Sequence, residues 1–202
     1  MTIHILIPTT EERRERLTKC IASIHENAGV PHIISTYENY REGFVKPCHL
    51  LLKNLKEDTM VWCIGDDTIL TEKDTLKRLL DVYMATYPNN DGVVQPDDGI
   101  QHGGIITMPL CTAKTMLEGT HEEYFLNYAD NEFTEVASRF GKYTYCPEIK
   151  VEHQHHINGK AKKDETYTYA STKFNDDAEV FRNRKMNNFK GNKLLEFYEK
   201  KL

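Results

Sequence analysis

The residues Met60-Val61-Trp62-Cys63-Ile64-Gly65-Asp66-Asp67-Thr68 form an apolar run that ends in two adjacent carboxylates. A strand that is buried on both faces can be apolar throughout. Asp66 and Asp67 would then lie at its carboxyl end, where open α/β sheets usually hold their ligands. Neighbouring carboxylates repel each other, and a divalent cation makes that arrangement favourable. The alternative is an Asx-type turn or a helix N-cap, since aspartate is common in both.

Segments typical of strands and helices alternate on both sides of this run. Apolar, β-rich segments predict strands at residues 3–7, 31–37, 60–65, 93–94, 103–108 and 143–151. Apolar residues at helical spacing predict helices at 11–27, 48–55, 73–84 (capped by Thr71), 111–117, 125–140, 176–184 and 193–201, with a lysine-rich loop at 158–168. The first strand, helix and strand predict a parallel pair with a right-handed crossover. We therefore expect an α/β fold with a mainly parallel sheet.

The bulk composition is that of an ordinary globular protein. A length of 202 residues fits one domain with a sizeable core. No apolar run approaches the roughly 20 residues of a membrane span, and the N-terminus lacks the basic-then-apolar layout of a signal peptide. The five cysteines are widely spread, mostly in apolar segments, which predicts buried, reduced thiols in a cytoplasmic protein. No CxxC pair indicates structural zinc.

Charge is distributed unevenly along the chain. The net charge is −5, so no global basic field attracts a polyanion. Residues 155–202 nevertheless hold 11 Lys and Arg against 7 Asp and Glu, a net of +4 that leaves −9 on the first 154 residues. Such a basic portion is typical of a solvated helix face, and the alternative is contact with phosphate in a nucleotide, a nucleic acid or a membrane surface. The −9 remainder argues against extensive contact with duplex nucleic acid.

Two further clusters carry groups that can do chemistry. Asp130 and Glu132 lie in a helical segment, where they point roughly 200° apart and so do not share one task. Each is otherwise a surface carboxylate, and Asp130 fits an N-cap equally well. His153 and His155 follow a strand and face the same side of an extended chain. Imidazole together with carboxylate suits Mn²⁺ or Zn²⁺, whereas a surface histidine cluster without a role is the alternative.

The order of these elements resembles that of the GT-A-fold, family 2-like glycosyltransferases over residues 3–156. The motifs are the opening strand at 3–10, the run 61–67 as a DXD-type motif, Asp130-Asn131-Glu132-Phe133 as an acidic motif, and the strand at 141–153 before a metal-binding histidine. Two features depart from the family: Gly65 occupies the first DXD position, so the acids are adjacent, and residues 36–39 lack an Asp-Gly-Ser-type turn. The small size and residues 164–167 look similar to short phage or bacterial members.

The resemblance implies a GT-A fold and an enzyme that moves a sugar from a nucleoside diphosphate, with a UDP-sugar favoured, to an acceptor hydroxyl. Residues 1–156 would form the catalytic domain, and residues 157–202 would add a loop and helices to the same domain as a lid. By similarity, the residues that bind the nucleotide-sugar would be Pro8, Thr9, Thr10, Glu38, Asp66, Lys162 and Lys163.

The same resemblance implies a metal and a base. Asp67 would coordinate Mn²⁺ or Mg²⁺ at the donor diphosphate, with His153 or His155 as a further ligand. The expected reaction is an inverting single displacement, with Asp130 as general base and Glu132 as the fallback. Separately, His102 would line the acceptor site, and a structural histidine is the alternative at that position.

Two other functions stay open at this level. A nucleotidyltransferase on a similar sheet would typically carry a glycine-rich phosphate loop after the first strand, and residues 8–12 contain no glycine. A non-catalytic nucleotide-sugar binding module would keep the fold but has no need of both acids and His153. The acceptor is open among a saccharide, a lipid-linked glycan, a protein and a modified DNA base. The protein is expected to be cytoplasmic, with no integral membrane segment.

Overall fold

A seven-stranded sheet organises the computed structural model, which describes residues 1–38 and 42–201. The strands are β1 (Ile3–Thr9), β2 (His32–Glu38), β3 (Met60–Cys63), β4 (Thr68–Leu70), β5 (Val93–Asp97), β6 (Leu110–Thr112) and β7 (Tyr143–His153). The helices are α1 (Arg14–Asn27), α2 (Val45–Leu52), α3 (Thr75–Thr86), α4 (Ala113–Gly119), α5 (Ala129–Arg139), α6 (Glu165–Met186) and α7 (Lys193–Glu199), with 3₁₀ turns η1 (Glu11–Arg13) and η2 (His156–Asn158). Asn39, the end of the predicted 36–39 segment, lies outside the described residues.

The sheet is mixed, with the strand order β2-β1-β3-β6-β5-β7-β4. Strand β1 pairs in parallel with β2 and β3, and β5 pairs in parallel with β7. Strand β6 is antiparallel to both of its neighbours, and β4 is antiparallel to β7. The parallel β1–α1–β2 unit confirms the predicted opening of an α/β fold, and the short strands β6 and β4 give the sheet its mixed character.

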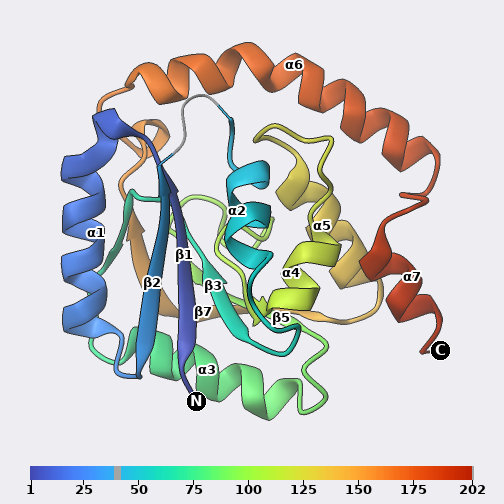
Figure 1. Cartoon of the computed structure of the whole chain (residues 1–202), viewed down its shortest axis with the longest axis horizontal. Coiled ribbons are helices and arrows are strands. Elements are labelled where there is room, and N and C mark those ends of the chain that lie inside the picture. The colour runs from blue at the N-terminus through green and yellow to red at the C-terminus, as the bar shows by residue number, and fades with distance from the viewer. Residues whose placement is uncertain (39–41, 202) are drawn as a thin grey trace.

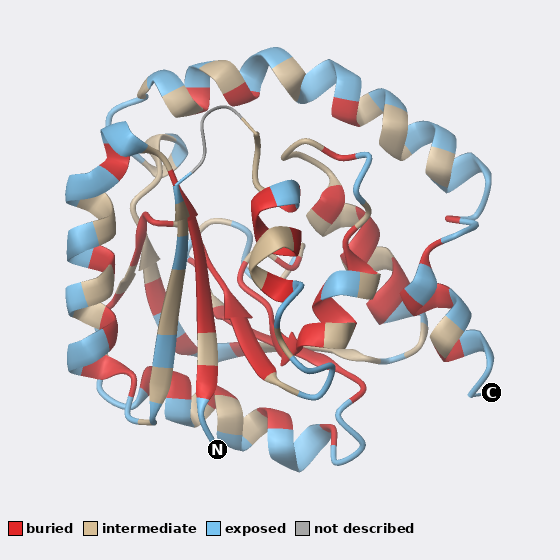
Figure 2. Ribbon diagram, viewed as in Figure 1, coloured by how far each residue is buried: buried red, intermediate tan, exposed pale blue. Residues whose placement is uncertain are grey.

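Helices cover both faces of the sheet (Figure 1). Helices α1 and α3 pack on one face, mainly against β4, β5 and β7, while α2 and α4 pack on the other. The long helix α6 runs across the carboxyl ends of β1 and β2 (Figure 1). The core follows the central strands: every residue of β3 is buried, as are Ile5 and Leu6 of β1 (Figure 2). A strand buried from both sides is what the run before the acidic pair predicted.

All five cysteines are buried and free, as the sequence predicted. Within residues 1–38 and 42–201, no helix combines the length and the apolarity that crossing a bilayer requires.

The segment 103–108, predicted as a strand, is a loop, and the strand that follows it is Leu110–Thr112. The backbone of this loop forms hydrogen bonds with the side chain of Gln95 instead of with a neighbouring strand. Gln95 donates to the carbonyl of Ile105 and accepts from the amide of Thr107, at 2.8 and 2.7 Å. The prediction was wrong because the apolar run has its hydrogen bonds met by side chains, which no strand pattern reveals.

Helix α3 begins later than predicted. The sequence predicts a start at residue 73 after a Thr71 cap, whereas α3 begins at Thr75 and Asp74 precedes it in the left-handed region (φ 60°). Residues 68–70 form β4, which pairs with β7, and a turn that ends at Asp74 separates this strand from the helix. A three-residue strand is too short to leave a periodic signal in the sequence.

Helix α6 begins inside the region predicted as a loop. It starts at Glu165 because Asp164 caps it, accepting a hydrogen bond from the amide of Tyr167 at 3.0 Å. The helix then continues to Met186, through the residues 169–175 that the sequence left unassigned. Its residues are mostly exposed or half-buried, so it lacks the apolar stripe by which helices are recognised (Figure 2).

Strand β7 has a bulge at Pro147 and changes partner after Lys150. It pairs with β5 up to Cys146 and again at Lys150, with a bulge between. Proline has no amide to donate, so the bulge falls where the ladder cannot continue. The far end of β7 then pairs with β4, in a register that sets His153 opposite Thr68. This pairing brings a histidine beside the end of the acidic pair.

A buried ion pair ties the C-terminal helices to α5. The carboxylate of Glu132 is fully buried and accepts two hydrogen bonds of 2.7 Å from Arg184 of α6. It also accepts from Asn192, the cap of α7 (2.7 Å), and from Tyr124 (2.8 Å). Opposite charge and neutral donors together offset the cost of taking Glu132 out of water.

Removal of this charge should destabilise the fold. We expect Glu132→Gln to lower the free energy of unfolding by about 3–5 kcal/mol, because Arg184, whose side chain is only 10% exposed, would lose its counter-charge. The matched control is Glu135→Gln, on the same helix, whose partner Lys185 is exposed and whose loss should cost less than about 1 kcal/mol. Urea unfolding of both variants measures the difference. Equal midpoints would contradict the structural role of Glu132.

Candidate functional site

The acidic pair lies at the carboxyl end of β3, where the chain leaves the sheet before β4. Both side chains are buried: Asp66 is 2% exposed and Asp67 is 4% exposed. Gly65 fits this turn because a Cβ there would lie 2.4 Å from Oδ1 of Asp67. Any larger residue would therefore push this carboxylate out of place. This steric limit explains why glycine stands in the first position of the DXD-like motif.

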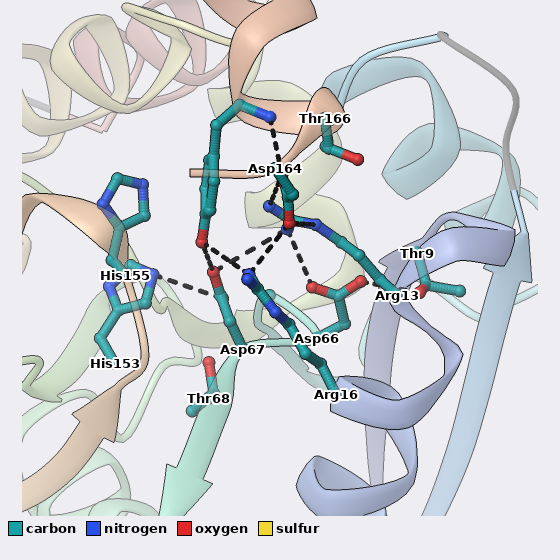
Figure 3. Close-up of polar contacts among 12 residues, drawn as sticks. Thr9, Arg13, Arg16, Asp66, Asp67, Thr68, His153, His155, Asp164 and Thr166 are labelled. Atoms are coloured by element: carbon teal, nitrogen blue, oxygen red, sulfur yellow. Dashed lines mark hydrogen bonds and ion pairs between the residues drawn. The ribbon is translucent and has the colours of Figure 1, made fainter. Parts of the chain in front are cut away.

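Asp66 faces the first strand and the turn after it. Its Oδ2 accepts a hydrogen bond from the hydroxyl of Thr9 (2.7 Å), and its Oδ1 accepts from Nη1 of Arg13 (3.1 Å) (Figure 3). Burial raises the pKa of Asp66 to about 6, although Arg13 opposes the shift and the charge of Asp67 adds to it. Asp66 is thus a carboxylate whose charge depends on its neighbours.

Asp67 faces the opposite way, toward β7 and α6. The hydroxyl of Tyr167 donates to its Oδ2 (2.5 Å), and Nε2 of His153 lies 3.3 Å from its Oδ1. Burial raises the pKa of Asp67, but His153, Tyr167 and Arg13 outweigh it, so this pKa lies well below its usual range. Burial likewise lowers the pKa of His153, and the facing carboxylates of Asp67 and Asp98 outweigh it and raise that pKa to about 9.

Arg13 connects the acidic pair to the start of α6. Its Nε and Nη2 bond both oxygens of Asp164 (3.0 and 3.1 Å) while its Nη1 bonds Asp66 (Figure 3). The guanidinium also lies over the ring of Tyr167, 4.1 Å from its centroid. Arg16, one turn further, pairs with the same Asp164 at 3.2 Å. The N-terminus of α6 is therefore held over the carboxylates by ionic contacts.

Two cavities meet at the acidic pair. The first, of about 540 Å³, is lined by five of the residues predicted to bind the nucleotide-sugar, namely Pro8, Thr9, Thr10, Glu38 and Asp66. The second, of about 610 Å³, is lined by the predicted metal and base residues Asp67, Asp130, His153 and His155. Arg13, Gly65 and Thr166 line both cavities and form the boundary between them. The motifs that are far apart in the sequence are thus brought to one place.

Asp130 lies in the first turn of α5, after Tyr128, which caps the helix in the left-handed region (φ 65°). Its Oδ1 accepts a hydrogen bond from the amide of Asn131 (2.9 Å). Desolvation raises the pKa of Asp130 to about 6 despite that bond. Glu132 points away, into the ion pair with Arg184, and lines neither cavity. The predicted divergence of the two acids is confirmed.

The two candidate histidines differ in their surroundings. His153 ends β7 and faces Asp67, whereas Nδ1 of His155 accepts from the amide of Ile157 (3.2 Å) as the cap of η2. The ring of His155 packs on Tyr167, with centroids 4.4 Å apart. Burial, with His153 adding to it, lowers the pKa of His155 to about 4. Of the two histidines, His153 is therefore the one whose ring faces the carboxylate of Asp67.

Besides Glu132, three predicted site residues lie away from the cavities. His102 is exposed and pairs with Asp97 at 3.0 Å. Lys162 and Lys163 are exposed in the segment before α6, where the carbonyl of Lys162 accepts from Arg16 (3.2 Å). None of the three lines either cavity. Among the described residues, the cation that lines both cavities is instead Arg13, which the sequence did not single out.

A divalent cation fits beside Asp67. Its Oδ1 and Nε2 of His153 lie 3.3 Å apart, which suits two ligands of one ion that each lie about 2.0–2.2 Å from it. Among residues 1–38 and 42–201, no group of three or more His, Cys, Asp or Glu could hold a metal ion. Mg²⁺ in particular is commonly held by one or two carboxylates with water and substrate phosphates. Two protein ligands therefore suit a site that a diphosphate completes.

The sequence missed four residues of this site, namely Arg13, Asp98, Asp164 and Tyr167. Arg13 and Asp164 lie in charged stretches that resemble solvated surface. Asp98 lies in a turn-rich segment, where aspartate is common. The weak signal available was the position of Arg13 in the turn that follows the first strand, where the predicted sheet holds its ligands.

Comparison with known proteins extends these observations. No protein-family model and no curated protein matches the sequence. The structure is similar to the catalytic domain of Drosophila β1,4-galactosyltransferase 7 in complex with xylobiose, with a TM-score of 0.54 and 14% identity, over 84% of this chain and 78% of that chain. A mutant of that enzyme in complex with manganese, UDP-Gal and xylobiose gives a TM-score of 0.53 and 14% identity, over 83% and 79%.

A third similar structure is that of the glycosyltransferase GlyE of Streptococcus pneumoniae, with a TM-score of 0.46 and 11% identity over 72% of this chain and 46% of that chain. Only the similarity to the galactosyltransferase, with TM-scores above 0.5, is close enough to assign the fold. It shows that this chain has the GT-A fold, as its motifs predicted. Identity of 14% shows the fold alone.

Loss of Arg13 should destabilise the fold. We expect Arg13→Met to lower the free energy of unfolding by about 3–5 kcal/mol, since the buried Asp66 would lose its cation. Arg14→Met is the control, because its side chain is 68% exposed and its loss should change stability by less than about 0.5 kcal/mol. Urea unfolding measures the free energy of unfolding of both variants. If Arg13→Met unfolds with the same free energy as the parent, the stabilising role of this ion pair is contradicted.

Proposed function

We propose that this protein is a metal-dependent, inverting glycosyltransferase that moves a sugar from a nucleoside diphosphate, with UDP favoured, to an acceptor hydroxyl. The observation that carries the proposal is the meeting of two cavities at Asp66 and Asp67. One cavity offers the residues for a nucleotide, and the other offers a carboxylate for the acceptor. A transferase needs both substrates to reach one point, and this junction provides it.

The first cavity suits the nucleoside diphosphate. Among the residues that line it, Thr9 and Glu38 supply polar groups, and Phe44 and Phe125 supply apolar surface. The diphosphate end would lie toward the boundary, where Arg13 provides a buried cation. In that position its guanidinium can form paired hydrogen bonds with phosphate oxygens, for which its planar shape is suited.

The metal position lies between the two cavities. Asp67 and His153 would hold Mn²⁺ or Mg²⁺, and the ion would stabilise the charge that develops on the leaving diphosphate. The galactosyltransferase of similar fold was crystallised with manganese and UDP-Gal, which supports the same pairing of metal and nucleotide for this chain. Tyr167 and Arg13 now contact Asp67, so they orient the carboxylate that the ion would use.

The second cavity suits the acceptor. Asp130 lines it and would take the proton from the acceptor hydroxyl as that oxygen attacks the sugar. A pKa of about 6 keeps Asp130 ionised at neutral pH while leaving it a stronger base than a free aspartate. One carboxylate in this position fits a single displacement, in which the enzyme forms no covalent bond to the sugar. The similar galactosyltransferase structures hold xylobiose, which favours a saccharide as acceptor.

Nucleotide binding provides the direct test. We expect UDP to bind the full-length protein tightly only with Mn²⁺ or Mg²⁺, as measured by isothermal titration calorimetry. Asp67→Ala should weaken metal-dependent binding at least about 30-fold, since a buried charged partner is lost. Asp81→Ala removes an exposed aspartate of α3 and should bind like the parent. Equal affinity of Asp67→Ala and the parent would reject the assignment.

The pH dependence tests the base. A base works only when deprotonated, so the rate of UDP release from a UDP-sugar, with water as acceptor, should rise as the pH increases through about 6 and then level off. Asp130→Asn should lower kcat by about 10²–10⁴-fold. UDP·Mn²⁺ affinity should stay unchanged, because Asp130 lines only the second cavity. A parental rate in Asp130→Asn would exclude it as the base.

A further inference from the structure

A further buried carboxylate lies at the other nitrogen of the His153 ring. Asp98 directly follows β5 and is 3% exposed. Its Oδ1 accepts hydrogen bonds from the amides of Ile100 (2.9 Å) and Gln101 (2.8 Å). Its Oδ2 accepts from the hydroxyl of Thr107 (2.9 Å). These bonds fix the carboxylate in one orientation, so its direction toward the histidine is set by the fold.

The imidazole of His153 lies between two carboxylates. Its Nε2 is 3.3 Å from Oδ1 of Asp67, and its Nδ1 is 3.9 Å from Oδ2 of Asp98. The Nδ1 atom is buried and finds no hydrogen-bond partner within the described part of the chain. Asp98 is the acceptor that the geometry offers to a proton on Nδ1. A ring movement of roughly 1 Å would bring the two atoms to the usual hydrogen-bond distance of about 2.9 Å.

We propose that Asp98 is a positioning residue that prepares His153 to bind the divalent cation, an inference that rests on the proposed function. Neutral histidine carries one N–H, and the group at one nitrogen decides where the proton lies. With the proton on Nδ1 directed at Asp98, the lone pair of Nε2 points to the position beside Asp67. Histidines that bind metals almost always donate their second N–H in this way, which fixes the ring and raises its basicity.

The geometry also shows why the carboxylate, rather than an amide, is needed. In Asp98→Asn the side-chain oxygen can still accept from the amides of Ile100 and Gln101, so the turn can be kept. The new amide group would then replace Oδ2 and present N–H to Nδ1 of His153. Nδ1 would have to accept, the ring proton would move to Nε2, and Nε2 would lose its lone pair for the metal.

Metal affinity measures this effect without any need for turnover. We would titrate Mn²⁺ into the full chain with saturating UDP and follow free Mn²⁺ by electron paramagnetic resonance. Asp98→Asn should lower the Mn²⁺ affinity about 10- to 100-fold, with UDP affinity in the absence of metal unchanged. Asp97→Asn is the matched control: it removes the same charge one residue away, where the partner is the exposed His102, and should bind Mn²⁺ like the parent.

The position of the ring proton gives a second test that needs no variant. In the parent protein with Mg²⁺ and UDP bound, ¹⁵N–¹H correlation spectra should show the His153 proton on Nδ1. A proton on Nε2, or parental Mn²⁺ affinity in Asp98→Asn, would overturn the proposal while Mn²⁺-dependent UDP binding by the parent upholds the proposed function. A parent that binds UDP no better with Mn²⁺ or Mg²⁺ than without would overturn both. If Asp98→Asn fails to fold, the parent spectrum decides alone.

Discussion

The mutual repulsion of two buried, consecutive carboxylates is the constraint on which the rest of the site depends. Taking one ionised group out of water costs several kcal/mol, and two neighbours of like charge cost more. Two basic side chains offset this cost: Arg13 pairs with Asp66, and His153 pairs with Asp67. Each cation comes from a different element, so the local electrostatics require that η1 and the end of β7 both reach the turn after β3. The sheet order and the bend of β7 satisfy this requirement.

Helix α6 takes part in the same balance. Its cap, Asp164, shares Arg13 with Asp66, and its Tyr167 donates to Asp67. These contacts are polar and lie at the boundary of the two cavities, whereas the far end of α6 is held by the buried Arg184–Glu132 pair. The two ends of one helix are therefore secured differently: the start by groups that a phosphate or a cation can also bind, and the end by groups that line neither cavity.

The sequence predicts what local pattern encodes and misses what tertiary contact decides. The apolar run before Asp66 identifies a buried strand, because burial on two faces leaves a continuous signal. Strand β4 is too short to leave such a signal, yet its pairing with β7 places His153, rather than His155, opposite Thr68 and beside the acidic pair. Asp130 and Glu132 look alike in the sequence, and only the ion pair with Arg184 distinguishes the one that faces the cavity. Arg13 and Asp98 belong to the site through contacts with residues more than 50 positions away.

The bulge in β7 has a consequence for how this chain can vary. Residues 147 and 148 are exposed, and exposed bulges and loops ordinarily tolerate insertions and deletions. A strand, however, alternates its faces with each residue, so a change of one residue before Lys150 would turn His153 to the other side of β7. The length of this solvent-exposed segment is therefore as restricted as the identity of a buried side chain. In homologues that keep the histidine, the number of residues between Cys146 and Lys150 should stay constant, while the exposed residues 147 and 148 vary.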